Sequence, residues 1–456
     1  MLTAIIASFI IGYVAIAFEH PLKLDKTVPA LLMGAVMWAF VSLGHIDVIY
    51  VEDNEYYTLP PDGNYYDWML KVLLHHLGKI AEILFFLIGA MTIVELVDLH
   101  KGFSVITNRI RTTNKKKMLV LVSILAFLLS AILDNLTTTI VLVSLLRRLV
   151  PDKNERIWYA SMVIIAANAG GAFSPIGDVT TTMLWIGKKV STLHLLENLV
   201  VPSVVCLVVP MIILMFKKEF QGNLSVPSNR NFDEAVKSEG LLSSGTMLMV
   251  GVGSLIFVPV FKGLTHLPPY MGMILGLGVT WLVSEYIHPE EDFPEERKKM
   301  YSAHTALSRI EMSSILFFLG ILLAVAALES VIVINAAGDP VGLLHHLAEM
   351  LQEAIPNQDL VIILIGVFSA IIDNVPLVAA TMGMYSEPMD AELWHFIAYA
   401  AGTGGSMLII GSAAGVAAMG MERIDFIWYL KKIAWLAAAG FLAGALVFIG
   451  WYQLLN

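Results

Sequence analysis

Long apolar blocks, separated by short polar connectors, run along almost the whole chain. They cover residues 1–18, 28–44, 71–97, 118–146, 157–187, 198–216, 242–261, 267–287, 312–338, 360–385, 393–421 and 433–452. A helix that crosses a bilayer needs about 20 apolar residues, and most of the blocks have that length. The pattern therefore predicts an all-α polytopic membrane protein.

Two of these blocks, 118–146 and 360–385, are too long for one comfortable span and too short for two. Each has an Asp-Asn pair near its middle, Asp134-Asn135 in the first and Asp373-Asn374 in the second. An arm of about 13 residues reaches about 20 Å at 1.5 Å per residue, which is past the middle of a bilayer core. We therefore expect each block to form a re-entrant helical hairpin with the Asp-Asn pair at its tip.

Flanking charge indicates that the two hairpins enter from opposite sides. Lysines and arginines lie in 109–117 and in 147–156, on both sides of the first hairpin, which places both of its ends in the cytoplasm. The segment 311–421 contains no Lys or Arg, so the ends of the second hairpin are predicted to be external.

The same rule orients the rest of the chain. Loop 45–67 lacks Lys and Arg and is predicted to be external, whereas loop 288–310 is basic and is predicted to be internal. About ten spans plus two hairpins then place both termini outside. Lys188 and Lys189 fall on the external side, which the rule disfavours.

The two halves also match in the order of their elements. Ile83-Leu-Phe-Phe-Leu87 recurs as Ile315-Leu-Phe-Phe-Leu319, and each copy precedes a hairpin and then an over-long, glycine-broken block. Matching halves with opposite flanking charge indicate two inverted repeats, each with a re-entrant hairpin and a broken transmembrane helix. The expected division is an N-terminal helix at 1–26, a first repeat at 27–216 with its broken helix at 157–187, a linker and connecting helix at 217–266, and a second repeat at 267–456 with its broken helix at 393–421.

The interruptions carry the polar residues of the membrane blocks. Helix breaks at membrane depth persist only where they line a cavity or a site. The residues that we expect to bind a transported ion or proton are Asp134, Asn135, Thr137, Asp178, Thr180, Thr181, Asp373 and Asn374. The polar residues expected to support them are Ser130, Asn168, Ser174, Ser369, Ser406, Ser412 and Glu82. Pairing each hairpin tip with the broken helix of its own half predicts two oxygen-rich pockets near the midplane.

The chemistry of these pockets favours a cation. Their blocks contain Asp134, Asp178 and Asp373 but no Lys or Arg, and carboxylates, hydroxyls and carbonyls are the ligands of hard cations. An anion would be repelled by the same carboxylates. A proton and a small metal cation compete for one set of oxygens, and such competition with alternating access is sufficient for exchange. The position that matches Asp178 is Ser412, so the first pocket is predicted to be the better ion site.

Composition excludes several classes of protein. The chain is 57% hydrophobic and 14% charged, with a mean hydropathy of +0.75 and a net charge of −10. A globular domain is roughly 25% charged, and a nucleic-acid binder needs a basic face, so neither class fits. The single cysteine, Cys206, cannot form an internal disulfide. Residues 1–18 lack a basic start and a small-residue cleavage site, so they are interpreted as a retained helix.

At single positions a purely structural role is an alternative to ion binding. A Ser or Thr in a membrane helix forms a hydrogen bond between packed helices about as often as it serves as a ligand. Glu82 fits a proton pathway and a snorkelling surface group equally well. An intramembrane aspartyl protease built on Asp134 and Asp178 requires Gly-x-Gly-Asp, whereas this chain has Pro175-Ile-Gly-Asp178, and that function would leave the inverted repeat unexplained.

The motifs Leu133-Asp-Asn-Leu-Thr-Thr-Thr139, Ser174-Pro-Ile-Gly-Asp-Val-Thr-Thr181 and Ile372-Asp-Asn-Val-Pro-Leu377 resemble those of NhaD-type sodium/proton antiporters. These antiporters belong to the ion transporter superfamily, which includes arsenite pumps and dicarboxylate carriers, and the likeness covers almost the whole chain. The resemblance implies exchange of cytoplasmic Na⁺ or Li⁺ for external H⁺, with Asp134, Asp178 and Asp373 as Na⁺ ligands.

The resemblance also implies a homodimer in the lipid bilayer of a bacterial-type inner membrane. It further implies a fixed scaffold beside a transport domain that moves like an elevator, with no cofactor and no nucleic-acid partner. Dicarboxylate carriers have Ser-Asn-Thr at both tips, where this chain has Asp in place of Ser, which argues against a carboxylate substrate. The position of Thr137 corresponds to Pro376 in the second repeat, which argues against equal roles for the two tips. The alternative function is transport of another solute, arsenite or an organic anion.

Overall fold

The protein is described by a computed structural model that covers the chain except residues 53–54, 62, 111, 225–240, 288–298, 336–337, 339, 372 and 456. The centre of the predicted linker and the first part of the predicted internal loop 288–310 therefore lie outside the described residues. The described chain is helical apart from two small antiparallel sheets. Strand β1 (Tyr50–Glu52) pairs with β2 (Glu55–Tyr57), and β3 (Ile332–Ile334) pairs with β4 (Pro340–Gly342).

Six helices form a continuous row in which each helix packs against the next. In spatial order they are α1 (Leu2–Ala17), α3 (Thr27–Leu43), α16 (Met312–Ser330), α4 (Tyr65–Leu99), α13 (Pro269–Tyr286) and α12 (Ser244–Thr265). Helices α16 and α4, at the middle of the row, both carry the Ile-Leu-Phe-Phe-Leu motif and therefore correspond to each other in the two halves. The helix that packs on the outer side of each, α3 or α13, then corresponds to the other in the same way. The packing thus makes α12 the counterpart of α1, and this helix row has the symmetry of an inverted repeat.

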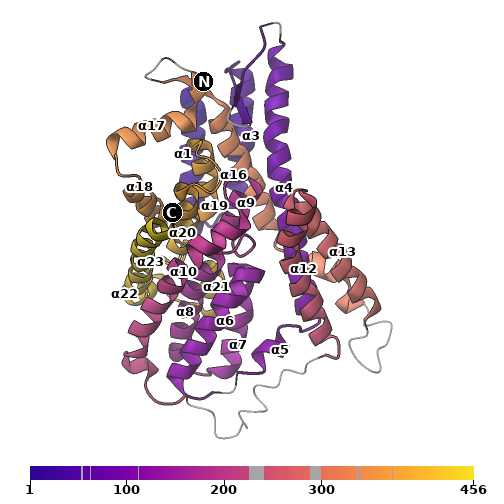
Figure 1. The fold of residues 1–456 in the computed structure, drawn as a ribbon, viewed down its shortest axis with the longest axis vertical. Coiled ribbons are helices and arrows are strands. Elements are labelled where there is room, and N and C mark those ends of the chain that lie inside the picture. Colours follow the sequence, from indigo (N-terminus) through magenta and orange to yellow (C-terminus); the bar gives the residue numbers. More distant parts are fainter. Residues whose placement is uncertain are drawn as a thin grey trace.

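The remaining long helices form a second body, the hairpin domain. Its first half contains α6 (Lys115–Leu133), α7 (Asn135–Leu149), α8 (Lys153–Ala172), α9 (Val179–Ile186) and α10 (Thr192–Met215). Its second half contains α18 (Gln358–Ser369), α19 (Asn374–Met384), α20 (Glu392–Gly404), α21 (Ala413–Glu422) and α23 (Ala434–Leu455). The domain packs against the row chiefly where α19 meets α16 and α9 meets α4 (Figure 1).

Short helices connect these elements. They are α2 (Glu19–Leu22), α5 (Ser104–Thr107), α15 (Ala303–Arg309), α17 (Leu343–Ala354) and α22 (Phe426–Lys432), with 3-10 turns η1 (Lys218–Phe220) and η2 (Lys299–Tyr301). Within the described chain, six helices are long and apolar enough to cross a membrane alone: α4, α6, α10, α12, α16 and α23. Helices α17 and α18 meet at a bend of 117°. These features confirm the predicted all-α polytopic class.

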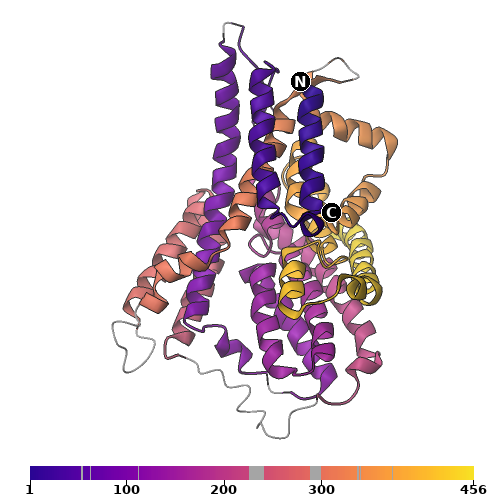
Figure 2. The same ribbon diagram turned by 180° about the vertical axis from the view of Figure 1, so that it is seen from behind.

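Both hairpins turn at their Asp-Asn pair, and capping explains why. Helix α6 ends at Leu133, and the Asp134 side chain accepts a hydrogen bond from the Thr137 N–H at 2.7 Å, which starts α7. Asp373 caps α19 in the same way, with the Val375 N–H at 3.2 Å from its carboxylate. The views from the front and from behind show that α6–α7 and α18–α19 enter the domain from opposite ends (Figures 1 and 2).

Each half also contains a helix interrupted by glycines. The break between α8 and α9 covers 173–178, and the break between α20 and α21 covers 405–412. A Cβ atom built on Gly170 would overlap the carbonyl oxygen of Phe127 in α6, and one built on Gly404 would overlap that of Gly366 in α18. Glycine is therefore required in both halves for the hairpin backbone to lie directly against the broken helix.

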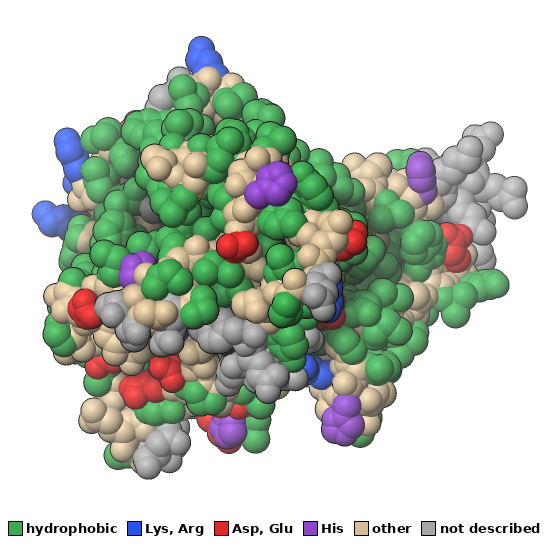
Figure 3. Space-filling model, turned by 90° about the horizontal axis from the view of Figure 1, so that it is seen from above, with side chains coloured by type: hydrophobic (Ala, Val, Ile, Leu, Met, Phe, Trp, Pro, Cys, Tyr) green, Lys and Arg blue, Asp and Glu red, His purple; other side chains and the backbone are tan. Residues whose placement is uncertain are grey.

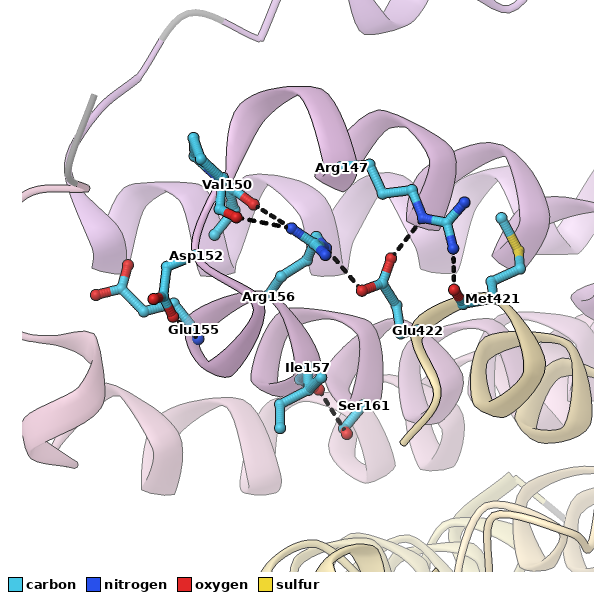
Figure 4. Close-up of polar contacts among 10 residues, drawn as sticks. Arg147, Val150, Asp152, Glu155, Arg156, Ile157, Ser161, Met421 and Glu422 are labelled. Carbon is cyan, nitrogen blue, oxygen red and sulfur yellow. Dashed lines mark hydrogen bonds and ion pairs between the residues drawn. The ribbon is translucent and has the colours of Figure 1, made fainter. Parts of the chain in front are cut away.

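Polar clamps tie the two halves of the hairpin domain together at both ends. At one end the buried carboxylate of Glu422, which ends α21, is 2.7 Å from the Nε atoms of Arg147 and Arg156, as Figure 4 shows. At the other end the carboxylate of Asp390 accepts hydrogen bonds from the Ser191 N–H at 2.6 Å and from the His194 ring at 3.0 Å. The two broken helices are thereby held side by side.

Candidate functional site

Both hairpin tips meet at one buried carboxylate, that of Asp178. This residue precedes α9 in an extended conformation and is 3% exposed. Its Oδ2 atom accepts hydrogen bonds from the Thr180 hydroxyl at 2.6 Å and from the Asn374 amide at 3.1 Å. Its Oδ1 atom accepts one from the Asn135 amide at 3.3 Å. A residue from each hairpin tip is therefore bonded to the first broken helix.

A chain of amides extends this arrangement to the second broken helix. The Asn135 amide also donates to Oδ1 of Asn168 at 3.0 Å, and the Asn168 amide donates to the Ser412 hydroxyl at 3.0 Å. Ser412 in turn accepts the Gly415 N–H at 3.2 Å and so starts α21. We call the six residues Asn135, Asn168, Asp178, Thr180, Asn374 and Ser412 the central cluster.

The central cluster corrects the prediction of two separate pockets. The second tip was paired with the broken helix of its own half, but Asn374 is bonded to Asp178, in the first half. The physical reason is the packing of the two broken helices against each other: α20 lies against α8 and α9. Because both breaks face the same space, the four interruptions form a single polar centre.

The three aspartates that were expected to be Na⁺ ligands, two in the first pocket and one in the second, have different partners in the structure. The Asp134 carboxylate is turned back on its own helix, where it accepts the Thr137 N–H and, at 3.0 Å, the Thr137 hydroxyl. The Asp373 carboxylate lies 2.7 Å from the Nζ atom of Lys26. Among the residues that the structure describes, no three His, Cys, Asp or Glu side chains are close enough to hold a metal ion. Asp178 alone belongs to the central cluster, although the charges of Asp134 and Asp373 both act on it.

Two of the predicted supporting serines make the same contact in the two halves. The Ser130 hydroxyl donates to the carbonyl oxygen of Ala167 at 2.6 Å, and the Ser369 hydroxyl donates to that of Ala401 at 2.9 Å. Each bond joins the first arm of a hairpin to the broken helix beside it. These serines position the backbone and do not reach Asp178.

Other predicted residues have local partners. Thr181 donates to the carbonyl oxygen of Ser174 at 2.7 Å, which closes the turn of the first break. Ser406 donates to the carbonyl oxygen of Thr403 at 2.6 Å in the second break. Glu82 lies on α4, where its charge faces Lys188, Lys262 and Lys79, and the structure shows no hydrogen bond from it to the central cluster, all of whose residues are described. The structure thus brings some of the predicted residues together and leaves others at the periphery.

The partners of the Asp178 carboxylate are all neutral. Two amides and one hydroxyl contact it, and within the described chain no Lys or Arg is hydrogen-bonded to it. A buried carboxylate without a basic partner is costly, so its charge has to be neutralised by a cation or a proton. The cluster also offers the carboxylate, hydroxyl and amide oxygens that alkali and other hard cations prefer.

A cavity of about 600 Å³ opens beside the first hairpin tip. It lies between α4 of the helix row, the short connecting helix α5 and α7 of the hairpin domain, and Glu95, Asp98 and Thr137 are among its lining residues. Since Thr137 is bonded to Asp134, the cavity reaches the tip of the first hairpin. The cavity therefore leads to the tip, and its lining carries two acidic side chains together with the basic Lys101 and Arg148.

Lys26 is the residue of this region that the sequence analysis missed. It lies in the connection between α1 and α3, among polar residues of a loop, and nothing in the local pattern distinguishes it from a solvated charge. The only available signal was the absence of basic residues from the second hairpin, whose tip aspartate needs a partner from elsewhere. The contact joins residues 347 positions apart.

Comparison with known sequences gives a consistent set of relatives. A family model described as citrate transporter, CitMHS, matches residues 13–394. Sodium/proton antiporters 1 and 2 of Arabidopsis thaliana are similar to the chain at 47% and 44% identity, over 98% and 97% of this chain and 72% and 97% of theirs. The Na(+)/H(+) antiporter NhaD of Alkalimonas amylolytica is 28% identical over 95% of this chain and 90% of its own.

A solved structure shares the fold. The YdaH transporter of Alcanivorax borkumensis, whose crystal structure was described as having an unusual topology, superposes with a TM-score of 0.56 at 14% identity. The match covers 94% of this chain and 97% of that one. Agreement over nearly the whole length extends to both halves of the chain.

Proposed function

Because this chain belongs to the CitMHS family of membrane transporters, with the Arabidopsis sodium/proton antiporters 1 and 2 among its relatives, we propose that it exchanges cytoplasmic Na⁺ or Li⁺ for external H⁺. The relatives are transporters, and the chain is a multi-pass membrane transporter and not an enzyme. Na⁺, Li⁺ and H⁺ are in this proposal the cargo, and no cofactor takes part.

The single observation that carries the proposal is the environment of Asp178. Its carboxylate is buried at the meeting point of both hairpin tips, and its partners Asn135, Thr180 and Asn374 are uncharged. A cation or a proton relieves the cost of this buried charge, and both use the same oxygen atoms. One carboxylate that holds either a metal ion or a proton, but not both, is the simplest basis for obligatory exchange.

The cluster becomes a cation site when its side-chain amides rotate. As they stand, the Asn135 and Asn374 amides present N–H groups to Asp178. A half-turn of either side-chain amide replaces that N–H group by an oxygen atom, because the amide has a donor on one side and an acceptor on the other. With the Thr180 hydroxyl beside it, Asp178 is then surrounded by oxygens, whereas the present orientation, with donors on both carboxylate oxygens, suits the ionised carboxylate without a bound metal ion.

The two bodies of the fold suit alternating access. In the proposal the helix row is a fixed scaffold and the hairpin domain moves across the membrane as an elevator, while a homodimer holds the scaffold in place. The clamps at Glu422 and Asp390 support this division, since they tie the hairpin domain to itself at both ends. The cavity at Thr137 lies between the two bodies and gives the cargo a path to the first tip.

The proposed orientation places the N-terminus and α17 outside a bacterial-type plasma membrane. Figure 3 shows this end of the molecule, where acidic side chains are scattered over a mainly hydrophobic surface. The connection from α7 to α8, next to which Arg147 and Arg156 lie in sequence, is at the opposite end of the hairpin domain (Figure 1), as the positive-inside rule requires of a cytoplasmic face.

Proteoliposomes test the proposal directly. The purified protein is reconstituted with an imposed pH gradient, and Na⁺, Li⁺, K⁺ and choline are added in turn across pH 6 to 9, while a fluorescent dye reports the gradient. Na⁺ and Li⁺ should dissipate the gradient, and K⁺ and choline should not. Asp178→Asn should abolish the response, whereas Glu353→Gln, an exposed acid at the end of α17, should retain it. A wild-type protein that leaves the gradient intact with every cation overturns the proposal.

The family description makes an organic anion the second candidate. Such a substrate would be repelled by Asp178, and the central cluster contains no basic side chain to bind it. Uptake of labelled citrate into the same proteoliposomes separates the two candidates, with labelled arsenite as a further arm. Accumulation of either solute, without any response to Na⁺, would favour the second function over the first.

A further inference from the structure

Lys26 connects the helix row to the tip of the second hairpin. It is the residue that precedes α3, and its Nζ atom lies 2.7 Å from Oδ2 of Asp373 and 4.4 Å from the centre of the Phe317 ring on α16. The two charged side chains are 26% and 17% exposed, so most of the ion pair is shielded by protein. Asp373 belongs to the hairpin domain, whereas Lys26 and Phe317 belong to the row. The pair therefore bridges the two bodies that are proposed to move relative to each other.

We propose that Lys26 holds Asp373 while Asp178 carries no cargo, and so locks the hairpin domain against the helix row whenever the hairpin domain is empty. This inference rests on the proposed cation exchange and adds to it a residue that couples movement to loading. Lys26 is a positioning residue in this scheme, because it contacts the tip and not the cargo. Its ammonium group supplies the counter-charge of Asp373 in the empty domain.

The free-energy cost of breaking the Lys26–Asp373 ion pair explains why the loaded hairpin domain moves and the empty one does not. When the hairpin domain moves, Asp373 leaves Lys26, and a carboxylate without a counter-ion in apolar surroundings is strongly unfavourable. A cation bound at the tips supplies the missing charge, so the loaded domain moves and the empty domain stays. A transporter that cannot return empty exchanges its cargoes with tight coupling.

The first hairpin tip is open to a cavity and the second is covered, which shows in which conformational state the Lys26–Asp373 pair forms. The first tip borders the cavity at Thr137, and the Asp134 carboxylate is held by the N–H and hydroxyl groups of Thr137. The second tip is covered by α16 and held by Lys26. The locked state is thus the one in which the first tip is open, which in the proposed orientation is the cytoplasmic side.

Cysteine labelling tests the lock without any transport measurement. In a Cys206→Ala background, Ser144→Cys places a thiol on α7 in the lining of the cavity. Labelling by a membrane-impermeant maleimide in choline buffer should be rapid when Lys26 is present. It should fall at least threefold in Lys26→Ala, because the empty hairpin domain is then free to leave this state. Lys26→Arg should label like the parent, and the exchanged pair Lys26→Asp with Asp373→Lys should restore rapid labelling. Labelling that is the same with lysine and with alanine overturns the lock.

A transport measurement tests the claim that Lys26 competes with the cation. The Na⁺ concentration that gives half the maximal rate of gradient dissipation should fall at least threefold in Lys26→Ala and stay within twofold in Lys26→Arg. An unchanged value in Lys26→Ala overturns the competition even where labelling changes. If the wild type shows no Na⁺ response at all, the proposed exchange fails, while the labelling series still decides whether the lock exists.

Discussion

The side-chain amide of Asn374 donates to Asp178 over 3.1 Å, from the tip of the second hairpin to the break in the first half of the chain. The Asn135 amide, from the other tip, reaches the opposite oxygen of the same carboxylate at 3.3 Å. The site of the first repeat is therefore incomplete by itself, since the residue that binds one oxygen of Asp178 comes from the second repeat. A single site at a repeat interface is where the cargo of an inverted-repeat transporter is expected to bind.

We expect Asn374→Ala to reduce Na⁺-dependent dissipation of the pH gradient by about 10- to 100-fold at subsaturating Na⁺. A hydrogen bond to a charged group contributes about 1.5–3 kcal/mol, and no neighbouring side chain replaces the lost amide. The initial rate of dye recovery in proteoliposomes measures the effect. Ser308→Ala, which removes an exposed hydroxyl near the end of α15, is the control and should leave the rate unchanged. An equal rate in Asn374→Ala and in the wild type would remove Asn374 from the site.

Local sequence patterns were sufficient to predict the hairpins and the breaks. An Asp-Asn pair in the middle of an over-long apolar block marks a tip because Asp caps the helix that follows, and paired glycines mark the place where backbones touch. The same capping gives the Asp134 carboxylate a partner within its own hairpin tip. A carboxylate that caps its own helix and one that awaits an ion have the same sequence environment.

The contacts between the halves could not be predicted in this way. The bond from Asn374 to Asp178 and the ion pair from Lys26 to Asp373 join residues 196 and 347 positions apart. Both depend on how whole helices pack, and no periodicity along the chain encodes that packing. The repeat was predictable as a pattern, but the fact that its two halves share one centre was a property of the assembled fold.

Glu422→Ala should destabilise the hairpin domain by about 3–5 kcal/mol, because it leaves two arginines without their buried partner. The arginines differ in exposure, at 47% for Arg147 and 14% for Arg156. Arg156→Ala should therefore cost more than Arg147→Ala. Thermal unfolding of the detergent-solubilised variants, followed by tryptophan fluorescence, gives the order. A larger loss for Arg147→Ala would show that exposure does not determine the strength of this clamp.

The clamp at Asp390 should make stability depend on pH. Burial alone would raise the pKa of this carboxyl, but hydrogen bonds from Ser191 and His194 outweigh burial and hold the pKa below its usual value of 3.8. A depressed pKa means that the carboxylate stabilises the fold at pH above about 4, and that this contribution is lost as the pH falls through the lower folded value.

Asp390→Asn should accordingly lower the unfolding temperature at pH 7, by an amount that corresponds to about 1–3 kcal/mol. The difference between variant and wild type should shrink when both are compared near pH 3.5. Asn is the suitable substitute because Asp390 has a φ of 64°, a left-handed conformation that Asn tolerates. Glu353→Gln, in an exposed position, serves as the control. A difference that grows toward acid pH would contradict the depressed pKa.

The close approach of hairpin and broken helix requires glycine at Gly404, as it does at Gly170 in the first half. A methyl group at Gly404 would overlap the carbonyl oxygen of Gly366, and backbone atoms cannot move aside as the end of a side chain can. Gly404→Ala should therefore lower stability by about 1–3 kcal/mol and displace the second break from Asp178, so that Na⁺ exchange falls at least tenfold.

Gly420→Ala is the matched control on the same broken helix, because nothing lies within 4 Å of the added atom. Alanine is also the better helix former, so this variant should be at least as stable as the parent. The unfolding temperature and the rate of Na⁺-driven gradient dissipation are measured for both variants, Gly404→Ala and Gly420→Ala. Equal exchange in the two variants would show that the breaks do not need the contact between Gly404 and Gly366.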